Sequence, residues 1–249
     1  MPPNDLNVVD TRFFLTLYGA QTTPNWLRTA HTFAVFSKIE YYEDGSAKNF
    51  PSILSWLPAS GVIHLIGEEP GRNYTMPETL AFVAGADIYA TPTAWIVENL
   101  YTSALERISE LQGGKVAYIM SDRMSTRPHH ATNCIHAVSD IPIVVATLPM
   151  LDTKTLHGFS ASWAVYNHLS PWFVAVTDGQ MAEALKPIPG IEVMDEEKVA
   201  NLNQESVVKR EAIGHLIEAL NTLLPNYRLI DALNTLLPSR KEGTPSDSP

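Results

Sequence analysis

The sequence predicts a mixed α+β domain, with strands dominating the first part of the chain and helices the last. Two stretches rich in β-branched and aromatic residues, 12–19 and 29–39, indicate buried strands. Apolar residues recur at helical spacing before Gly113 and again after Val199. With 249 residues, of which 45% are hydrophobic, the chain is long enough for one well-packed core.

The charge and the cysteine content limit the classes of function. A net charge of -10 and a pI near 5.2 argue against sequence-independent nucleic-acid binding, which needs a basic surface. The first residues lack a basic region before an apolar run, and no apolar stretch is long enough to span a bilayer. One cysteine cannot form an internal disulfide. We therefore expect a cytoplasmic protein.

The second strand carries the first residue of chemical interest, His31, near its start. After the turn at 43–46, residues 53–57 predict a third strand that returns antiparallel to the second. This pairing would bring Ser55 close to His31, whereas His64 follows in a separate apolar run.

Helix signals follow in the middle of the chain. Residues 76–82 predict a short helix, and 115–120 a further strand. Between them, Thr91 is expected to cap a helix with Pro92 at its first position, ending at Gly113. The apolar stripe of this helix consists of Ile96, Leu100, Ala104, Ile108 and Leu111.

The only cysteine lies where a polar loop, 122–131, turns into an apolar helical pattern. Thr132 or Asn133 is the expected N-cap, which places Cys134 in the first turn of the helix. The helix dipole favours an anion there, so we expect a lowered thiol pKa. A lone cysteine can equally be a small buried hydrophobe. His136 points away from Cys134, since two residues turn a helix by about 200°.

The pattern beyond the cysteine is less regular. Residues 141–145 contain a proline and predict an irregular or edge segment. Asp152 or Thr153 could cap a helix through 158–166 that ends at Ser170-Pro171, and 172–176 predicts a strand.

The C-terminal part predicts an amphipathic helix from Val199 to Leu224, ended by Pro225. Residues 219–225 recur identically at 232–238, which indicates a local duplication whose leucine-rich surface could dock a protein partner.

We accordingly expect three parts. Residues 1–178 form the core domain, 179–240 a helical extension, and 241–249 a disordered tail of polar residues.

Two segments, His31-Thr32-Phe33-Ala34-Val35-Phe36 and Asn133-Cys134-Ile135-His136-Ala137-Val138, resemble a known arrangement. They are similar to the circularly permuted NlpC-like branch of the papain superfamily, which contains lecithin–retinol acyltransferase-like proteins. The resemblance covers roughly 13–138 and extends to uncharacterised bacterial proteins. It implies a papain-like antiparallel sheet packed with helices.

The resemblance also implies roles for residues. Cys134 would be the nucleophile and His31 the base that deprotonates it. The orienting third residue departs from the family pattern: Ser55 is the nearest counterpart by hairpin geometry, and His64 by residue type. Gln21 could add a side-chain amide to an oxyanion hole, although a surface loop position is the simpler interpretation.

Such a site would carry out acyl transfer. The thiolate attacks an amide, ester or thioester carbonyl of a small-molecule or peptide substrate, and the resulting thioester passes its acyl group to water or to another acceptor. The chain would then be a cysteine-dependent hydrolase or acyltransferase, and no cofactor is implied.

Two alternatives come from other classes. His129, His130, Cys134 and His136 are ligand types suited to zinc, but their crowding makes a four-ligand cage awkward. The chain could also be a non-catalytic binding or structural module of the same fold. A serine hydrolase elbow and a phosphate-binding loop are both missing from the sequence.

Overall fold

The computed structural model describes residues 7–22, 30–64, 67–120, 130–141, 158–175, 188, 191–195, 197–198 and 201. The chain divides into two compact units, Met1–Asn203 and Gln204–Pro249, and all the described residues belong to the first. The expected C-terminal helix has only Asn201 among them, and the repeated segment and the polar tail lie wholly outside them.

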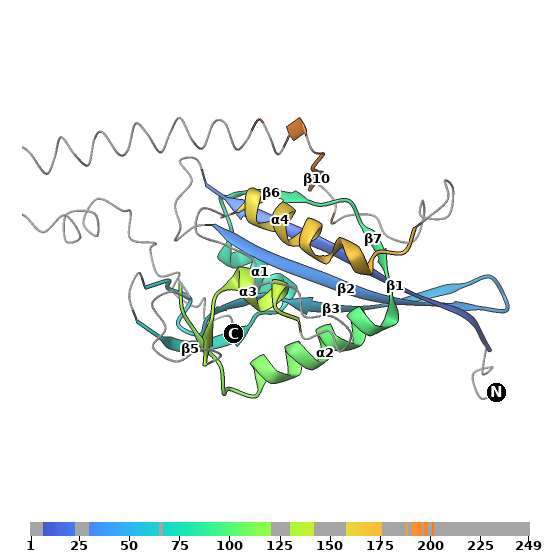
Figure 1. Ribbon diagram of the computed structural model, residues 1–249, viewed down its shortest axis with the longest axis horizontal. Coiled ribbons are helices and arrows are strands. Elements are labelled where there is room, and N and C mark those ends of the chain that lie inside the picture. The colour runs from blue at the N-terminus through green and yellow to red at the C-terminus, as the bar shows by residue number, and fades with distance from the viewer. Residues whose placement is uncertain are drawn as a thin grey trace, which may run out of the picture. The chain divides into compact units, whose positions relative to one another are not determined.

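The larger sheet is built on two long antiparallel strands, β1 and β2 (Figure 1). The strands expected at 12–19 and 29–39 are confirmed, with somewhat different ends. The strand order is β10-β6-β1-β2-β3, with β7 also paired to β1. The bounds are β1 Val8–Gln21, β2 His31–Tyr42, β3 Ala47–Leu54, β6 Asp87–Ala90, β7 Ala94–Ile96 and β10 Glu192–Val193.

The smaller sheet has the order β4-β5-β8-β9. Its strands are β4 Trp56–Pro58, β5 Glu69–Asn73, β8 Ala117–Tyr118 and β9 Ala131–Thr132. The third strand expected over 53–57 is therefore divided at Ser55, where the chain leaves one sheet and enters the other. The Ser55 N–H donates to Asn73 Oδ1 at 2.7 Å, and the Ser55 carbonyl accepts from the Tyr74 N–H at 2.8 Å. These bonds hold the junction.

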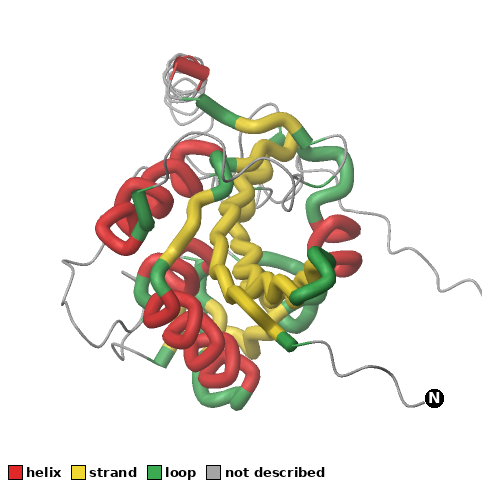
Figure 2. Tube along the Cα trace, turned by 90° about the vertical axis from the view of Figure 1, so that its right-hand side faces the viewer, coloured by secondary structure: helices red, strands yellow, loops and turns green. Residues whose placement is uncertain are grey.

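Helices lie on both sides of the long strands (Figure 2). They are α1 Met76–Phe82, α2 Glu98–Gln112, α3 Cys134–Ser139 and α4 Phe159–Leu169, which a 3-10 turn, η2 Ser170–Trp172, follows. The fold is thus α+β, as predicted. None of the helices in the described part of the chain is long and apolar enough to cross a membrane.

The helix expected to start at Pro92 begins later, at Glu98, with Val97 as its N-cap. The preceding residues Ala94–Ile96 pair with β1 instead, because the ladder gives their backbone groups hydrogen-bond partners. Thr91, expected to cap the helix, bonds to strand β1 instead: its Oγ1 accepts from the Leu17 N–H at 3.1 Å. The predicted end at Gly113 is confirmed.

Three further expectations need correction. The strand expected over 115–120 is only two residues long. In the strand expected over 172–176, Phe173 makes a single bridge to Ile96, and the preceding residues form the 3-10 turn. The segment from 179, expected to be helical, contributes strand β10, which runs parallel to β6. Each of these pairings is too short to leave a periodic signal in the sequence.

The two faces of the β1–β2–β3 sheet carry different side chains. Leu15 pairs with Phe36, and Leu17 with Ala34, and all four belong to the main hydrophobic cluster with residues of α2, α3 and α4. We call this side the helix-covered face. Side chains alternate along a strand, so Tyr18 and its partner Phe33 point the other way, into a second cluster. We call that side the α1 face.

Gly71 in β5 has no side chain, which allows the ring of Trp56 in β4 to pack closely against its backbone. A Cβ built at Gly71 would lie 2.0 Å from Cζ2 of Trp56, which is fully buried. We expect Gly71→Ala to lower the free energy of unfolding by about 1–3 kcal/mol through overpacking, measured by urea denaturation. The control is the same substitution in a Trp56→Phe background, where Cζ2 is missing. An equal loss in both backgrounds would contradict this origin.

Candidate functional site

Cys134 is the first residue of α3, and Asn133 is its N-cap, as the sequence predicts. The Asn133 side-chain oxygen accepts from the N–H groups of Ile135 at 2.9 Å and His136 at 2.8 Å. Two of the donors that would favour an anion at this helix start are therefore already bonded within the cap. Cys134 itself is 8% exposed and belongs to the main hydrophobic cluster.

His31 and Ser55 meet, as the hairpin geometry predicts. The His31 Nε2 lies 2.9 Å from Ser55 Oγ. A third member, Thr79 of α1, was not predicted from the sequence: its Oγ1 lies 2.7 Å from Ser55 Oγ and 2.8 Å from the Thr75 carbonyl oxygen. The three side chains are buried and link β2, the β3–β4 junction and α1.

The surroundings of His31 keep its ring neutral. The ring stacks on Phe33 with centroids 5.6 Å apart and meets the edge of Phe82 at 5.9 Å. Burial in this apolar environment lowers the pKa of His31 from 6.5 to about 3. A catalytic base of this kind would hold a proton poorly at neutral pH.

The register shows which way His31 points. His31 pairs with Ala20, and the next pair is Gly19 with Thr32. Gly19 lies against α4, because a Cβ there would be 2.5 Å from Ser162 Oγ. The Gly19 and Thr32 pair therefore belongs to the helix-covered face, and His31 to the α1 face.

The strand register and the hydrophobic clusters assign the two members of the proposed dyad to different faces of β2. Helix α3 packs on β2 beside α4, so Cys134 lies on the helix-covered face. His31 projects from the opposite side of the same strand, toward Ser55 and α1. The Nε2 of His31 lies 2.9 Å from Ser55 Oγ, and its Nδ1 makes no hydrogen bond within the described part of the chain.

The other two sequence candidates also have different neighbours. His64 is exposed, with 60% of its side chain accessible, and its Nδ1 lies 3.1 Å from Glu69 Oε2. Gln21 lies at the end of β1, where its Oε1 accepts from the Phe159 N–H at 3.4 Å. Its amide thus helps to cap α4, which is a structural role.

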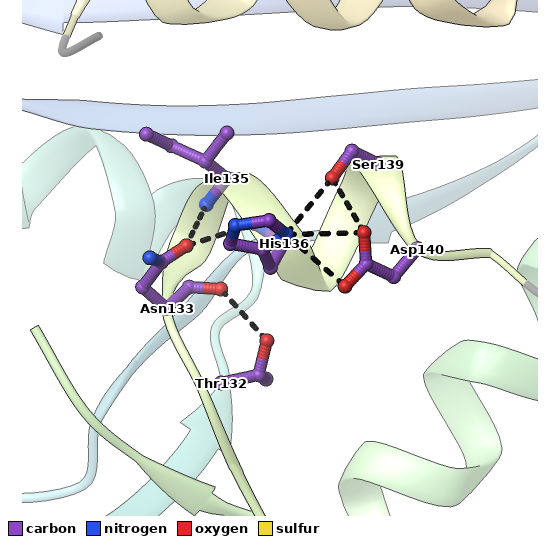
Figure 3. Close-up of polar contacts among 6 residues, drawn as sticks. All are labelled: Thr132, Asn133, Ile135, His136, Ser139 and Asp140. Carbon is purple, nitrogen blue, oxygen red and sulfur yellow. Dashed lines mark hydrogen bonds and ion pairs between the residues drawn. The ribbon is translucent and has the colours of Figure 1, made fainter. Parts of the chain in front are cut away.

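A polar cluster that was not predicted from the sequence closes the other end of α3 (Figure 3). The His136 Nδ1 lies 3.1 Å from both carboxylate oxygens of Asp140, and the Ser139 hydroxyl donates to Asp140 Oδ1 at 2.9 Å. The sequence itself contains a signal for this contact, because His136 and Asp140 are four residues apart and such residues face one another on a helix. Both Asp140 and His136 affect the titration of His168 in α4. Burial lowers the pKa of His168, Asp140 opposes this shift and His136 adds to it.

This cluster is not a serine-type catalytic relay, although it contains a serine, a histidine and an aspartate. Such a relay needs the hydroxyl on one ring nitrogen and the carboxylate on the other. Here Ser139 Oγ, at 3.4 Å, and Asp140 both approach Nδ1 of His136. The arrangement instead closes a short helix with its own side chains.

The zinc alternative has no support from the described residues. Within them, no group of three or more histidine, cysteine, aspartate or glutamate side chains is placed to hold a metal ion. His136 pairs with Asp140, and His129 lies outside the described residues.

No protein-family model, curated protein or solved structure matches the chain. The site must be interpreted from its own geometry.

Removal of the Ser55 hydroxyl should destabilise the fold. Ser55→Ala leaves the buried Nε2 of His31 without its partner, which we expect to lower the free energy of unfolding by about 1–3 kcal/mol, measured by urea denaturation. Ser60→Ala is the matched control, because Ser60 is exposed and bonds to Glu69 at the surface. Similar losses in both variants would argue against the buried network.

The Asn133 cap makes a second prediction. Asn133→Ala removes the acceptor of two N–H groups and should lower the free energy of unfolding by about 0.5–2 kcal/mol, with the loss appearing as a lower Tm. Asn133→Asp keeps the accepting oxygen and should retain most of the stability. An Asp variant as unstable as the Ala variant would contradict a capping role.

Proposed function

We propose that this chain is a non-catalytic α+β module that acts by binding, and that Cys134 is a residue of its core. The observation that carries the proposal is the placement of Cys134 and His31 on opposite faces of β2. The other three functional candidates, Ser55, His64 and Gln21, have partners that explain them structurally.

The chemical argument is one of proton transfer. A general base must lie about 2.6–3.2 Å from the group that it deprotonates. His31 instead uses Nε2 for Ser55, and its ring is enclosed by Phe33 and Phe82. His136, the nearest histidine in the sequence, is engaged with Asp140.

A second candidate is the cysteine-dependent hydrolase or acyltransferase of papain-like fold. One observation favours it: Cys134 occupies the first position of a helix capped by Asn133, as in the family that the sequence resembles. Its substrate would be a small-molecule or peptide amide, ester or thioester. This candidate requires His31 to leave the α1 face and approach the thiol.

The two candidates differ in how Cys134 titrates. We expect the rate of alkylation by iodoacetamide to rise with pH as for an ordinary thiol, with an apparent pKa of about 8.5 or above, and to keep this pH dependence in His31→Ala. The rate should be slow, since Cys134 is 8% exposed. The chain in denaturant supplies the reference titration.

His64→Ala is the matched control, because it removes an exposed histidine that lies apart from both residues. A wild-type thiol that titrates a unit or more below the denatured reference, and loses this shift in His31→Ala but not in His64→Ala, would overturn the binding proposal. It would establish the ion pair that the hydrolase needs.

A further inference from the structure

His31 connects three elements that are distant in the sequence. It is the first residue of β2, its Nε2 bonds to Ser55 between β3 and β4, and Ser55 in turn contacts Thr79 of α1. Phe82, also of α1, covers the ring edge-on. One imidazole therefore links α1 to β2 and to the β3–β4 junction.

Among the described residues, no acidic side chain is paired with the His31 ring, and burial is what shifts its pKa. Its Nδ1 makes no hydrogen bond within the described part of the chain. Of the titratable groups on the elements around it, Glu78 of α1 pairs with Arg72, and the Tyr74 hydroxyl donates to the Pro58 carbonyl. Tyr18 stacks on Phe33, which lies between Tyr18 and the His31 ring. Burial raises the pKa of Tyr18, so the Tyr18 hydroxyl stays neutral.

The charged side chains of the three long strands lie elsewhere. They occupy the opposite end of the β1–β2–β3 sheet from His31, where they pair with one another or lie over aromatic rings. They are Asp10, Arg12, Lys38, Glu40 and Lys48.

We propose that His31 is an acid-sensitive lock: as a neutral ring it fastens α1 and the β3–β4 junction to β2, and its protonation releases α1 from the sheet. Protonation makes both ring nitrogens donors. The Nε2–H then requires Ser55 to accept, the Nδ1–H has no described acceptor, and the added charge lies between two phenyl rings. Opening of the contact lets water solvate the imidazolium. This lock does not depend on any chemistry at Cys134.

The pH range follows from the two states of His31. In the closed state the pKa of His31 is about 3, against 6.5 for a solvated ring. A lowered histidine pKa means that the closed state is fully favoured above pH 6.5 and progressively lost as the pH falls toward 3. At pH 5.0 the equilibrium should have moved toward the open state by about thirtyfold relative to neutral pH.

Hydrogen exchange on the full chain tests the lock at the level of single elements. The N–H groups of Thr79 and Val83, bonded to the carbonyls of Thr75 and Thr79, report on α1, and those of α2 serve as the internal reference. After correction for intrinsic rates, protection in α1 should fall about thirtyfold from pH 7.5 to 5.0, and protection in α2 should fall far less.

Two variants complete the experiment. His31→Gln has no titrating ring and should abolish the selective loss in α1, whereas His64→Gln, at an exposed position, should behave as the wild type. Equal losses in α1 and α2, unchanged protection of α1, or the same pH dependence in His31→Gln would each overturn the proposal. If His31→Gln does not fold, the comparison of α1 with α2 in the wild-type chain still decides. Burial also lowers the pKa of His168, but this residue lies on α4, so its titration is distinguished from that of His31 by the element it affects.

Discussion

The pairing of β1 with β2 is the constraint on which the rest of the structure depends. It is continuous from Asp10 opposite Tyr41 to Ala20 opposite His31, and it determines which face each side chain occupies. One face gathers Leu15, Leu17, Ala34 and Phe36 under the helices, and the other places His31 beside Phe33. A shift of one residue would exchange the two sets, so burial of the apolar face fixes the register.

The junction at Ser55 shows how a polar residue can organise an apolar fold. Its backbone is bonded to the segment around Asn73, and its hydroxyl contacts both His31 and Thr79. Because a buried polar group without a partner is destabilising, each of the three side chains confines the others. The two sheets and α1 are therefore joined by hydrogen bonds where the chain changes direction.

Helix α3 is too short to be stable through its backbone alone, and side chains close both of its ends. Asn133 accepts at the first turn, and His136, Ser139 and Asp140 interact at the last. Position 134 is thus fixed within the core. The same features that make the helix start look like a nucleophile site also explain it as a structural element.

The sequence by itself determined the local features: the strands around His31, the cap at Asn133, the helix end at Gly113 and the proximity of Ser55 to His31, because each depends on neighbouring residues or on one hairpin. Only the tertiary structure decided that Thr91 serves β1, and that His31 and Cys134 face opposite ways. The face of a strand on which a distant helix packs depends on the whole core. No motif of a few residues contains that information, so the sequence could not indicate that the fold assigns the two residues to different faces of β2.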